Sequence, residues 1–190
     1  MKSSIFEKEI NYINDYRIKE SLKTMIELLP DYFFEVGASS TGKYHPSFSI
    51  GKGGLVRHTK SAVRIAVELF ADAALQRFTD HQKDLIIFSI VIHDGLKYGL
   101  VKNDYTKFDH PLLISKYLSD NMDKLKLSDD EIITIKECVE THMGPWVYDY
   151  NKIKVLDYPK TEEQKFVHLC DYLSSRRFLD IKFINNNIED

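Results

Sequence analysis

The residues best suited to chemistry are four histidines and two aspartates. They are His58, His93, Asp94, His110, His142 and Asp171. Both aspartates follow apolar stretches, where an unpaired carboxylate is costly to bury. One divalent ion, or a close pair, would satisfy these groups together. The donor set suits Mn, Fe, Ni, Co or Zn, while Mg prefers more oxygen ligands. A bound metal lowers the pKa of water and supplies hydroxide near neutral pH. For each histidine taken alone, a helix cap or a satisfied polar core stays open as the alternative.

These residues must be positioned by helices, because apolar side chains recur at helical spacing through most of the chain. Pro30 ends the first pattern, Pro111 suits a first helical turn, and Thr161 with Gln164 resembles a capping box. Helices are expected over residues 10–29, 55–75, 79–93, 110–121, 128–143 and 161–177. Loops are expected over residues 37–54 and 98–108, with only a weak strand pattern at 152–156. The prediction is an all-α fold, one helical domain in which helices of residues 1–36 pack on a core formed by residues 37–190.

The bulk composition is that of an ordinary globular domain. Of 190 residues, 43% are hydrophobic and 29% charged, and the formal net charge is −3. This charge gives no general attraction to nucleic acid or membrane, so a phosphate-bearing substrate must be attracted locally. No stretch approaches the ~20 apolar residues of a membrane span, and we expect a cytoplasmic protein without a membrane partner. Cys138 and Cys170 are expected to be reduced and buried. The N-terminal helices could also pair two subunits, which leaves an oligomer open.

Short motifs surround the six candidate ligands in a characteristic order. They are GGLVRHT at 53–59, IHDGLK at 92–97, DHP at 109–111, ETH at 140–142 and DYLSSR at 171–176. This series resembles the HD superfamily of metal-dependent phosphohydrolases over residues 53–177, about two thirds of the chain. The H-D pair alone would be a weak signal, whereas six ligand-type residues in the family order are a strong one.

The resemblance implies a role for each of these residues. His58, His93, Asp94 and Asp171 would hold a first metal ion, and Asp94 would bridge to a second ion held by His110 and His142. Metal-activated hydroxide would attack phosphorus in line, with Asp94 and Lys97 as the catalytic residues. Lys97 would neutralise phosphate charge or protonate the leaving group.

Two departures from the family pattern limit this carry-over. Gly95 directly follows Asp94, whereas the usual motif has its glycine just before the lysine. Met143 stands where members with a tandem His-His have a further ligand. Whether one or two ions bind is therefore open.

The segment before the first histidine narrows the resemblance. ASSTGKYHP at 38–46, followed by Gly-Gly-Leu, resembles the start of the HD domain in bacterial 3′-to-5′ exoribonucleases, although this chain has no room for their OB-type domain. The candidate substrate-binding residues are Lys43, Tyr44, His45, Arg57 and Arg176, which could contact phosphate or stack on a base. Trp146 could form a pocket rim or fill the core, and the core is the preferred interpretation.

We therefore expect a phosphodiesterase that acts on a nucleotide or short oligonucleotide. The alternatives are hydrolysis of dinucleoside polyphosphates or nucleotide monoesters, and a non-catalytic HD domain that senses a nucleotide.

Overall fold

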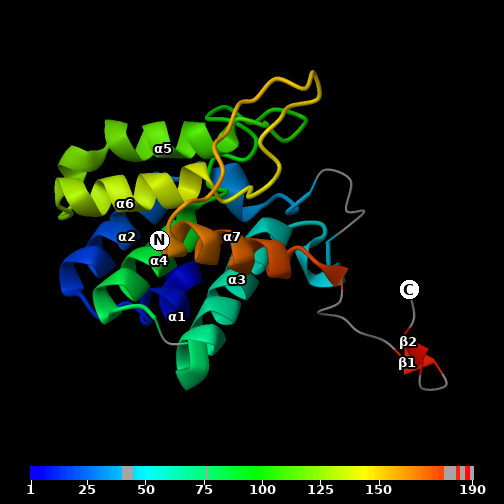
Figure 1. The fold of residues 1–190 in the computed structure, drawn as a ribbon. Coiled ribbons are helices and arrows are strands. Elements are labelled where there is room, and N and C mark those ends of the chain that lie inside the picture. Colours follow the sequence, from blue (N-terminus) through cyan, green and yellow to red (C-terminus); the bar gives the residue numbers. More distant parts are fainter. Residues whose placement is uncertain (40–44, 76, 178–182, 185–186, 189–190) are drawn as a thin grey trace.

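A computed structural model describes residues 1–39, 45–75, 77–177, 183–184 and 187–188. The α-helices are α1 (Glu7–Ile10), α2 (Tyr16–Leu28), α3 (Gly54–Ala71), α4 (Asp80–Ile92), α5 (His110–Asp120), α6 (Asp129–Glu140) and α7 (Glu162–Ser174). The 3-10 helices are η1 (Lys2–Phe6), η2 (Asp31–Phe34), η3 (Ser47–Ser49), η4 (Ala73–Leu75) and η5 (Met122–Lys124). Strands β1 (Phe183–Ile184) and β2 (Asn187–Ile188) form a short antiparallel pair. The predicted all-α fold is confirmed (Figure 1).

Polar caps fix where α2, α4, α6 and α7 begin. Asp15 accepts hydrogen bonds from the backbone amides of Arg17 and Ile18 at the start of α2. Thr79, Ser128 and Thr161 each complete a capping box with the Gln or Glu three residues later. Such a cap stabilises a helix by about 1 kcal/mol and satisfies amides that have no partner within the helix. The capping boxes therefore fix where α4, α6 and α7 begin, and these three helices hold or lead into candidate ligands.

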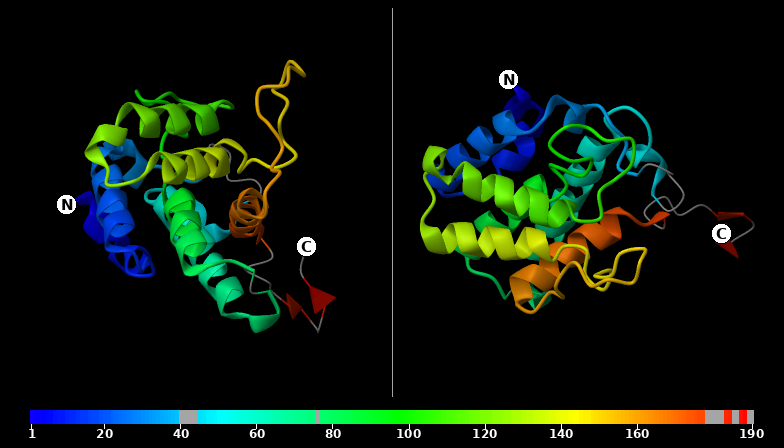
Figure 2. Two further views of the ribbon diagram at one scale, coloured as in Figure 1. Left: turned by 60° about the vertical axis from the view of Figure 1, so that its left-hand side comes forward. Right: turned by 90° about the horizontal axis from the view of Figure 1, so that it is seen from above.

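Helix α4 lies at the centre of the molecule. Every residue from Leu85 to Ile92 is buried, as expected for a helix that is apolar on all sides. Helices α2, α3, α6 and α7 all contact it, and the views in Figure 2 show how they surround it. The C-terminal end of α4, where the His93-Asp94 pair follows, is consequently held from several directions.

The N-terminal helices belong to the same core. Phe6, Ile10 and Leu22 lie in one apolar cluster with side chains of α3 to α7. The buried carboxylate of Asp84 in α4 accepts hydrogen bonds from the backbone amides of Asn14 (3.0 Å) and Asp15 (2.8 Å). These bonds satisfy two amides ahead of α2 and tie the first helices to α4.

Three helices end three or more residues earlier than the sequence pattern predicted, among them α7, which stops at Ser174. Helix α3 stops at Ala71, because Asp72 has an extended backbone (φ −77°, ψ 109°), and η4 follows it. Helix α6 stops at Glu140, so His142 lies just beyond the helix. The weak strand pattern at 152–156 yields one isolated bridge, between Tyr148 and Lys154.

Two loops extend from the same end of the antiparallel helices α5 and α6 (Figure 1). One joins α4 to α5 through residues 93–109, and the other joins α6 to α7 through residues 141–161. Tyr32 anchors the first loop, because its hydroxyl donates to the Gly99 carbonyl (2.6 Å) and accepts from the Tyr98 amide (3.3 Å). None of the helices in the described ranges combines the length and the apolar character of a membrane span.

Candidate metal centre

The six candidate ligands converge in one place. His58 comes from α3 and Asp171 from α7, while His93 and Asp94 follow the last turn of α4. His110 begins α5, and His142 follows α6. The structure therefore brings together residues that lie up to 113 positions apart in the sequence.

One oxygen of Asp94 faces a pair of imidazoles. Asp94 Oδ1 lies 3.0 Å from His110 Nε2 and 3.7 Å from His142 Nε2. The two Nε2 atoms are 3.1 Å apart. Ligands bonded at about 2.1 Å to one tetrahedral or octahedral metal lie about 3.0–3.4 Å from one another. The separations of 3.0 and 3.1 Å fall in this range and that of 3.7 Å lies somewhat beyond it, so a small shift of His142 or Asp94 would let the three atoms bind one ion.

The other oxygen of Asp94 faces a second group. Asp94 Oδ2 lies 3.4 Å from His93 Nε2 and 3.7 Å from His58 Nε2. Asp171 Oδ1 completes this group, at 2.9 Å from His58 Nε2 and 3.4 Å from His93 Nε2. Asp94 thus joins two ligand groups through two different oxygen atoms.

The outer nitrogen of each imidazole is fixed by an acceptor. His93 Nδ1 lies 2.6 Å from the Ile90 carbonyl, His110 Nδ1 2.6 Å from the Lys107 carbonyl and His142 Nδ1 2.7 Å from the Val139 carbonyl. His58 Nδ1 lies 3.0 Å from the Ser174 hydroxyl, which itself donates to the Asp171 carbonyl (2.8 Å). Each Nδ1 therefore carries a proton, and a cation can bind at Nε2 wherever that atom is unprotonated.

This arrangement fits a cation better than a hydrogen-bonded polar core. Because His110 and His142 both donate through Nδ1, their Nε2 lone pairs would repel at 3.1 Å without a positive charge between them. His93 Nε2 and Asp94 Oδ1 are buried and have no hydrogen-bond partner within the ranges that the structure describes. Buried polar atoms are rarely left in this state. The donor set and its spacing fit one or two divalent ions.

The charges of the site favour the ligand forms of most residues. Burial alone would raise the pKa of the Asp94 carboxyl, but the positive charges of Lys97 and His93 hold that pKa well below its usual range. Burial, His93 and His110 lower the pKa of His142 to about 3, so its imidazole is neutral. His93 is the exception. Burial opposes its charged form, but Asp94 and Asp171 raise its pKa to about 10. In the metal-free protein His93 therefore carries the positive charge that a metal would replace.

A cavity of about 300 Å³ opens over these ligands. Its lining includes the two predicted ligands His110 and Asp171, and also His45, Lys97, Thr106, Lys107, Phe108, Met143, Trp146, Tyr172, Ser175 and Arg176. Lys97 pairs with Asp94 Oδ2. The Lys107 amide donates to the Lys97 carbonyl (2.8 Å), and this hydrogen bond keeps the two lysines close together within one loop. The cavity therefore joins a cationic wall to the candidate metal centre.

The structure separates the five predicted substrate-binding residues. His45 and Arg176 line the cavity, and His45 Nδ1 is buried without a hydrogen-bond partner among the described residues. Arg57 lies outside the cavity, and its guanidinium donates to the backbone carbonyls of Phe48 and Ile50. Lys43 and Tyr44 fall outside the described residues. The preference for Trp146 as a core residue was wrong, because its side chain is 46% exposed at the cavity.

Sequence reasoning missed three residues that support the site. Ser174 orients His58, and Lys107 provides both an acceptor for His110 and a cavity cation. His168 donates from Nδ1 to the backbone carbonyl of His142 (2.8 Å). Only Ser174 had a local signal, since it lies within the DYLSSR motif. The cysteines Cys138 and Cys170 are buried and not disulfide-bonded, as expected.

Comparison of the chain with protein-family models, curated proteins and solved structures gave no match in any of the three. The functional assignment therefore depends on the residues and geometry described above.

Proposed function

We propose that this chain is a metal-dependent phosphohydrolase of the HD type, and that it cleaves phosphodiesters of a nucleotide or short oligonucleotide. The observation that carries the proposal is the position of Asp94, whose two oxygens face two separate groups of imidazole Nε2 atoms. A carboxylate placed in this way can bridge two divalent ions. His58, His93 and Asp171 would complete the first site, and His110 and His142 the second.

Two such ions, when bound, polarise phosphoryl oxygens and lower the pKa of a water molecule. The residues of the chain supply the remaining requirements. Lys97 and Arg176 line the cavity as hydrogen-bond donors for the non-bridging phosphoryl oxygens. Lys97 Nζ, which pairs with Asp94 Oδ2, would also give a proton to the leaving oxygen. Lys97 therefore stabilises the negative charge that develops on the leaving oxygen. The carboxylates would hold the metal ions, whose positive charge also stabilises it.

The volume and the charges of the cavity support a small, phosphate-bearing substrate. At about 300 Å³ it lies at the lower end of small-molecule sites, which span ~300–1,000 Å³. Such a space accepts one nucleotide unit and excludes a duplex. The three cations Lys97, Lys107 and Arg176 around it attract phosphate locally, in a chain whose formal net charge is −3.

The test combines metal content with turnover. Wild-type protein should retain one or two equivalents of Mn²⁺ after gel filtration and hydrolyse bis(4-nitrophenyl) phosphate. Asp94→Ala should lose the metal and at least about 100-fold in rate, because it removes the bridge between both groups. Asp120→Ala is the matched control, since its carboxylate is exposed and pairs with Lys116 on the surface of α5.

Absence of both bound metal and hydrolysis in the wild type would refute the proposal. Metal binding without turnover, on a panel of short RNA, cyclic nucleotides, dinucleoside polyphosphates and deoxynucleotides, would favour a nucleotide-sensing domain. Cleavage of monoesters alone would replace the phosphodiesterase assignment.

A further inference from the structure

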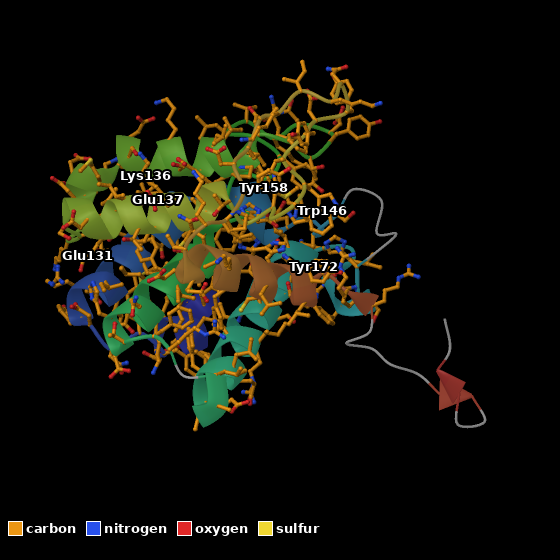
Figure 3. All side chains as sticks on the ribbon, viewed as in Figure 1. Glu131, Lys136, Glu137, Trp146, Tyr158 and Tyr172 are labelled. Atoms are coloured by element: carbon orange, nitrogen blue, oxygen red, sulfur yellow. The ribbon has the colours of Figure 1, made fainter. Side chains whose placement is uncertain are left out.

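Three side chains at the mouth of the cavity pack on one another. The rings of Trp146 and Tyr172 are stacked, with centroids 5.8 Å apart and planes 18° apart. The Arg176 guanidinium lies 4.4 Å from the centroid of Tyr172 and 5.9 Å from that of Trp146. Figure 3 shows Trp146 and Tyr172 close together near the end of α7. We call these three residues the aromatic cluster.

The cluster leaves ring surface open to a ligand. The distance from Arg176 to Trp146 is far shorter than the sum of their separate distances to Tyr172, so the two do not sandwich Tyr172 from opposite faces. Trp146 is 46% exposed, and Tyr172 and Arg176 are half-buried. Within the described part of the chain Arg176 forms no ion pair, and its hydrogen bond goes to the neighbouring Ser175 hydroxyl (3.1 Å).

The cluster is built onto the candidate metal centre. Tyr172 directly follows the ligand Asp171 in α7, and Arg176 lies four residues further along the chain. Trp146 follows the turn at Gly144, which packs on His168, and His168 in turn bonds to the carbonyl of the ligand His142. All three cluster residues line the same cavity as His110 and Asp171. A ligand ring on the cluster would therefore be held at a fixed position relative to a phosphoryl group over the metal ligands.

We propose that Trp146, Tyr172 and Arg176 form a base-stacking subsite, so that this site selects a nucleoside phosphate over a phosphate ester without a base. The inference rests on the proposed function for the position of the phosphate, but the subsite binds its ring independently of turnover. Exposed aromatic rings beside a cation are a general means of binding a nucleobase, which has a π face of its own. Arg176 serves both parts of the ligand, since it contacts the rings and lines the phosphate cavity.

Trp146 is the only tryptophan in the chain, so its fluorescence reports on this cluster alone. The full-length protein with Mn²⁺ is titrated with adenosine 5′-phosphorothioate, which resists hydrolysis, and separately with ribose 5-phosphate. The first carries the base, and the second carries the sugar and phosphate only. Saturable quenching by the adenosine compound is expected, and little or none by ribose 5-phosphate. Free N-acetyltryptophanamide corrects for light absorbed by the base.

Variants then assign the effect to the cluster. Tyr172→Leu should weaken binding of the adenosine compound about tenfold, within the range of one base stack. It should leave the inhibition of bis(4-nitrophenyl) phosphate hydrolysis by ribose 5-phosphate unchanged. Tyr172→Phe keeps the ring and should bind as the wild type. Tyr16→Leu is the matched control, because Tyr16 is an exposed tyrosine on α2 that does not line the cavity.

Equal responses to the two compounds, or wild-type affinity in Tyr172→Leu, would overturn the subsite. If circular dichroism shows that Tyr172→Leu is unfolded, Trp146→Ala and Trp146→Phe provide the same comparison by calorimetry. Hydrolysis of bis(4-nitrophenyl) phosphate without base-dependent quenching would reject the subsite and leave the proposed function intact. Base-dependent quenching without hydrolysis would support the subsite and reject the proposed function.

Discussion

The cavity has two parts with different construction. We call the six candidate ligands His58, His93, Asp94, His110, His142 and Asp171 its floor, although only His110 and Asp171 reach the cavity lining, and most of the six are within 3% of complete burial. Its rim consists of Lys107, Trp146, Tyr172 and Arg176. The floor residues come from helices or helix ends, and each imidazole has its outer nitrogen fixed. Three of the four rim residues, Lys107, Trp146 and Arg176, lie outside the helices, and all four side chains are half-buried or exposed.

Under the proposed function, the floor would determine the reaction and the rim would determine the substrate. A metal site requires ligand atoms placed within a few tenths of an ångström, and packed helices supply that precision. Recognition of a flat ring tolerates more freedom, and loops can change their residues without disturbing the core. We therefore expect changes in the floor to affect metal binding and stability, and changes in the rim to affect affinity for the substrate.

The largest expected effect concerns metal removal from the floor. Saturating Mn²⁺ should raise the free energy of unfolding of the wild type by about 4 kcal/mol at 1,000 times its dissociation constant. Asp171→Asn should lose most of this gain, because it weakens a carboxylate ligand that contacts both His58 and His93. Urea denaturation with Mn²⁺ and with EDTA measures the difference. Asp120→Asn should keep the full gain, and an unchanged gain in Asp171→Asn would remove Asp171 from the site.

The next effect is the pH dependence of metal binding. In the metal-free protein the pKa of His93 is raised to about 10, so its imidazole must lose a proton when metal binds. The carboxyls of Asp94 and Asp171 have lowered pKa values and stay ionised near neutral pH, and His142 stays neutral above about pH 3. Affinity should therefore fall about tenfold for each pH unit as pH falls from 8 to 6. Calorimetric titration with Mn²⁺ in buffers of different ionisation enthalpy counts the protons released, and a count of zero would contradict this charge state.

A third test concerns the turn at Gly144, which lies between the floor residue His142 and the rim residue Trp146. Gly144 has φ +63°, and a Cβ there would lie 2.2 Å from the ring of His168. Gly144→Ala should cost about 2–3 kcal/mol, from left-handed backbone strain and displacement of His168. Gly51→Ala is the control, because Gly51 has φ +71° with open space around it and should cost about 1 kcal/mol. Thermal unfolding measures both. Equal losses would mean that His168 does not hold the turn before Trp146.

The same division explains what the sequence could predict. The caps at Thr79, Ser128 and Thr161 lie in the sequence beside the helices they begin, so the helices could be located. The six candidate ligands could be chosen because each stands in a short motif with a fixed order. The structure adds that Asp94 divides its oxygens between two groups, a geometry that no local pattern contains.

The rim could not be predicted in this way. Lys107 reaches the cavity because its amide bonds to the Lys97 carbonyl, and Trp146 because Gly144 turns the chain against His168. Both depend on loop conformations without helical periodicity. Arg57 was predicted to bind the substrate, but it does not line the cavity. Its place beside His58 in the sequence does not determine where its side chain points. One residue further along α3, His58 points into the core, while Arg57 reaches back to the preceding loop.

The smallest expected effect tests that last distinction. Arg57→Ala removes hydrogen bonds to the Phe48 and Ile50 carbonyls, and their exposure limits the loss of stability to about 1 kcal/mol or less. Affinity for adenosine 5′-phosphorothioate should not change, since Arg57 lies outside the cavity. Arg176→Ala, its counterpart at the rim, should weaken that affinity with little effect on unfolding. Titration and urea denaturation of both variants give a crossed comparison. Weaker binding in Arg57→Ala at wild-type stability would place Arg57 at the substrate and reverse the assignment made from its contacts.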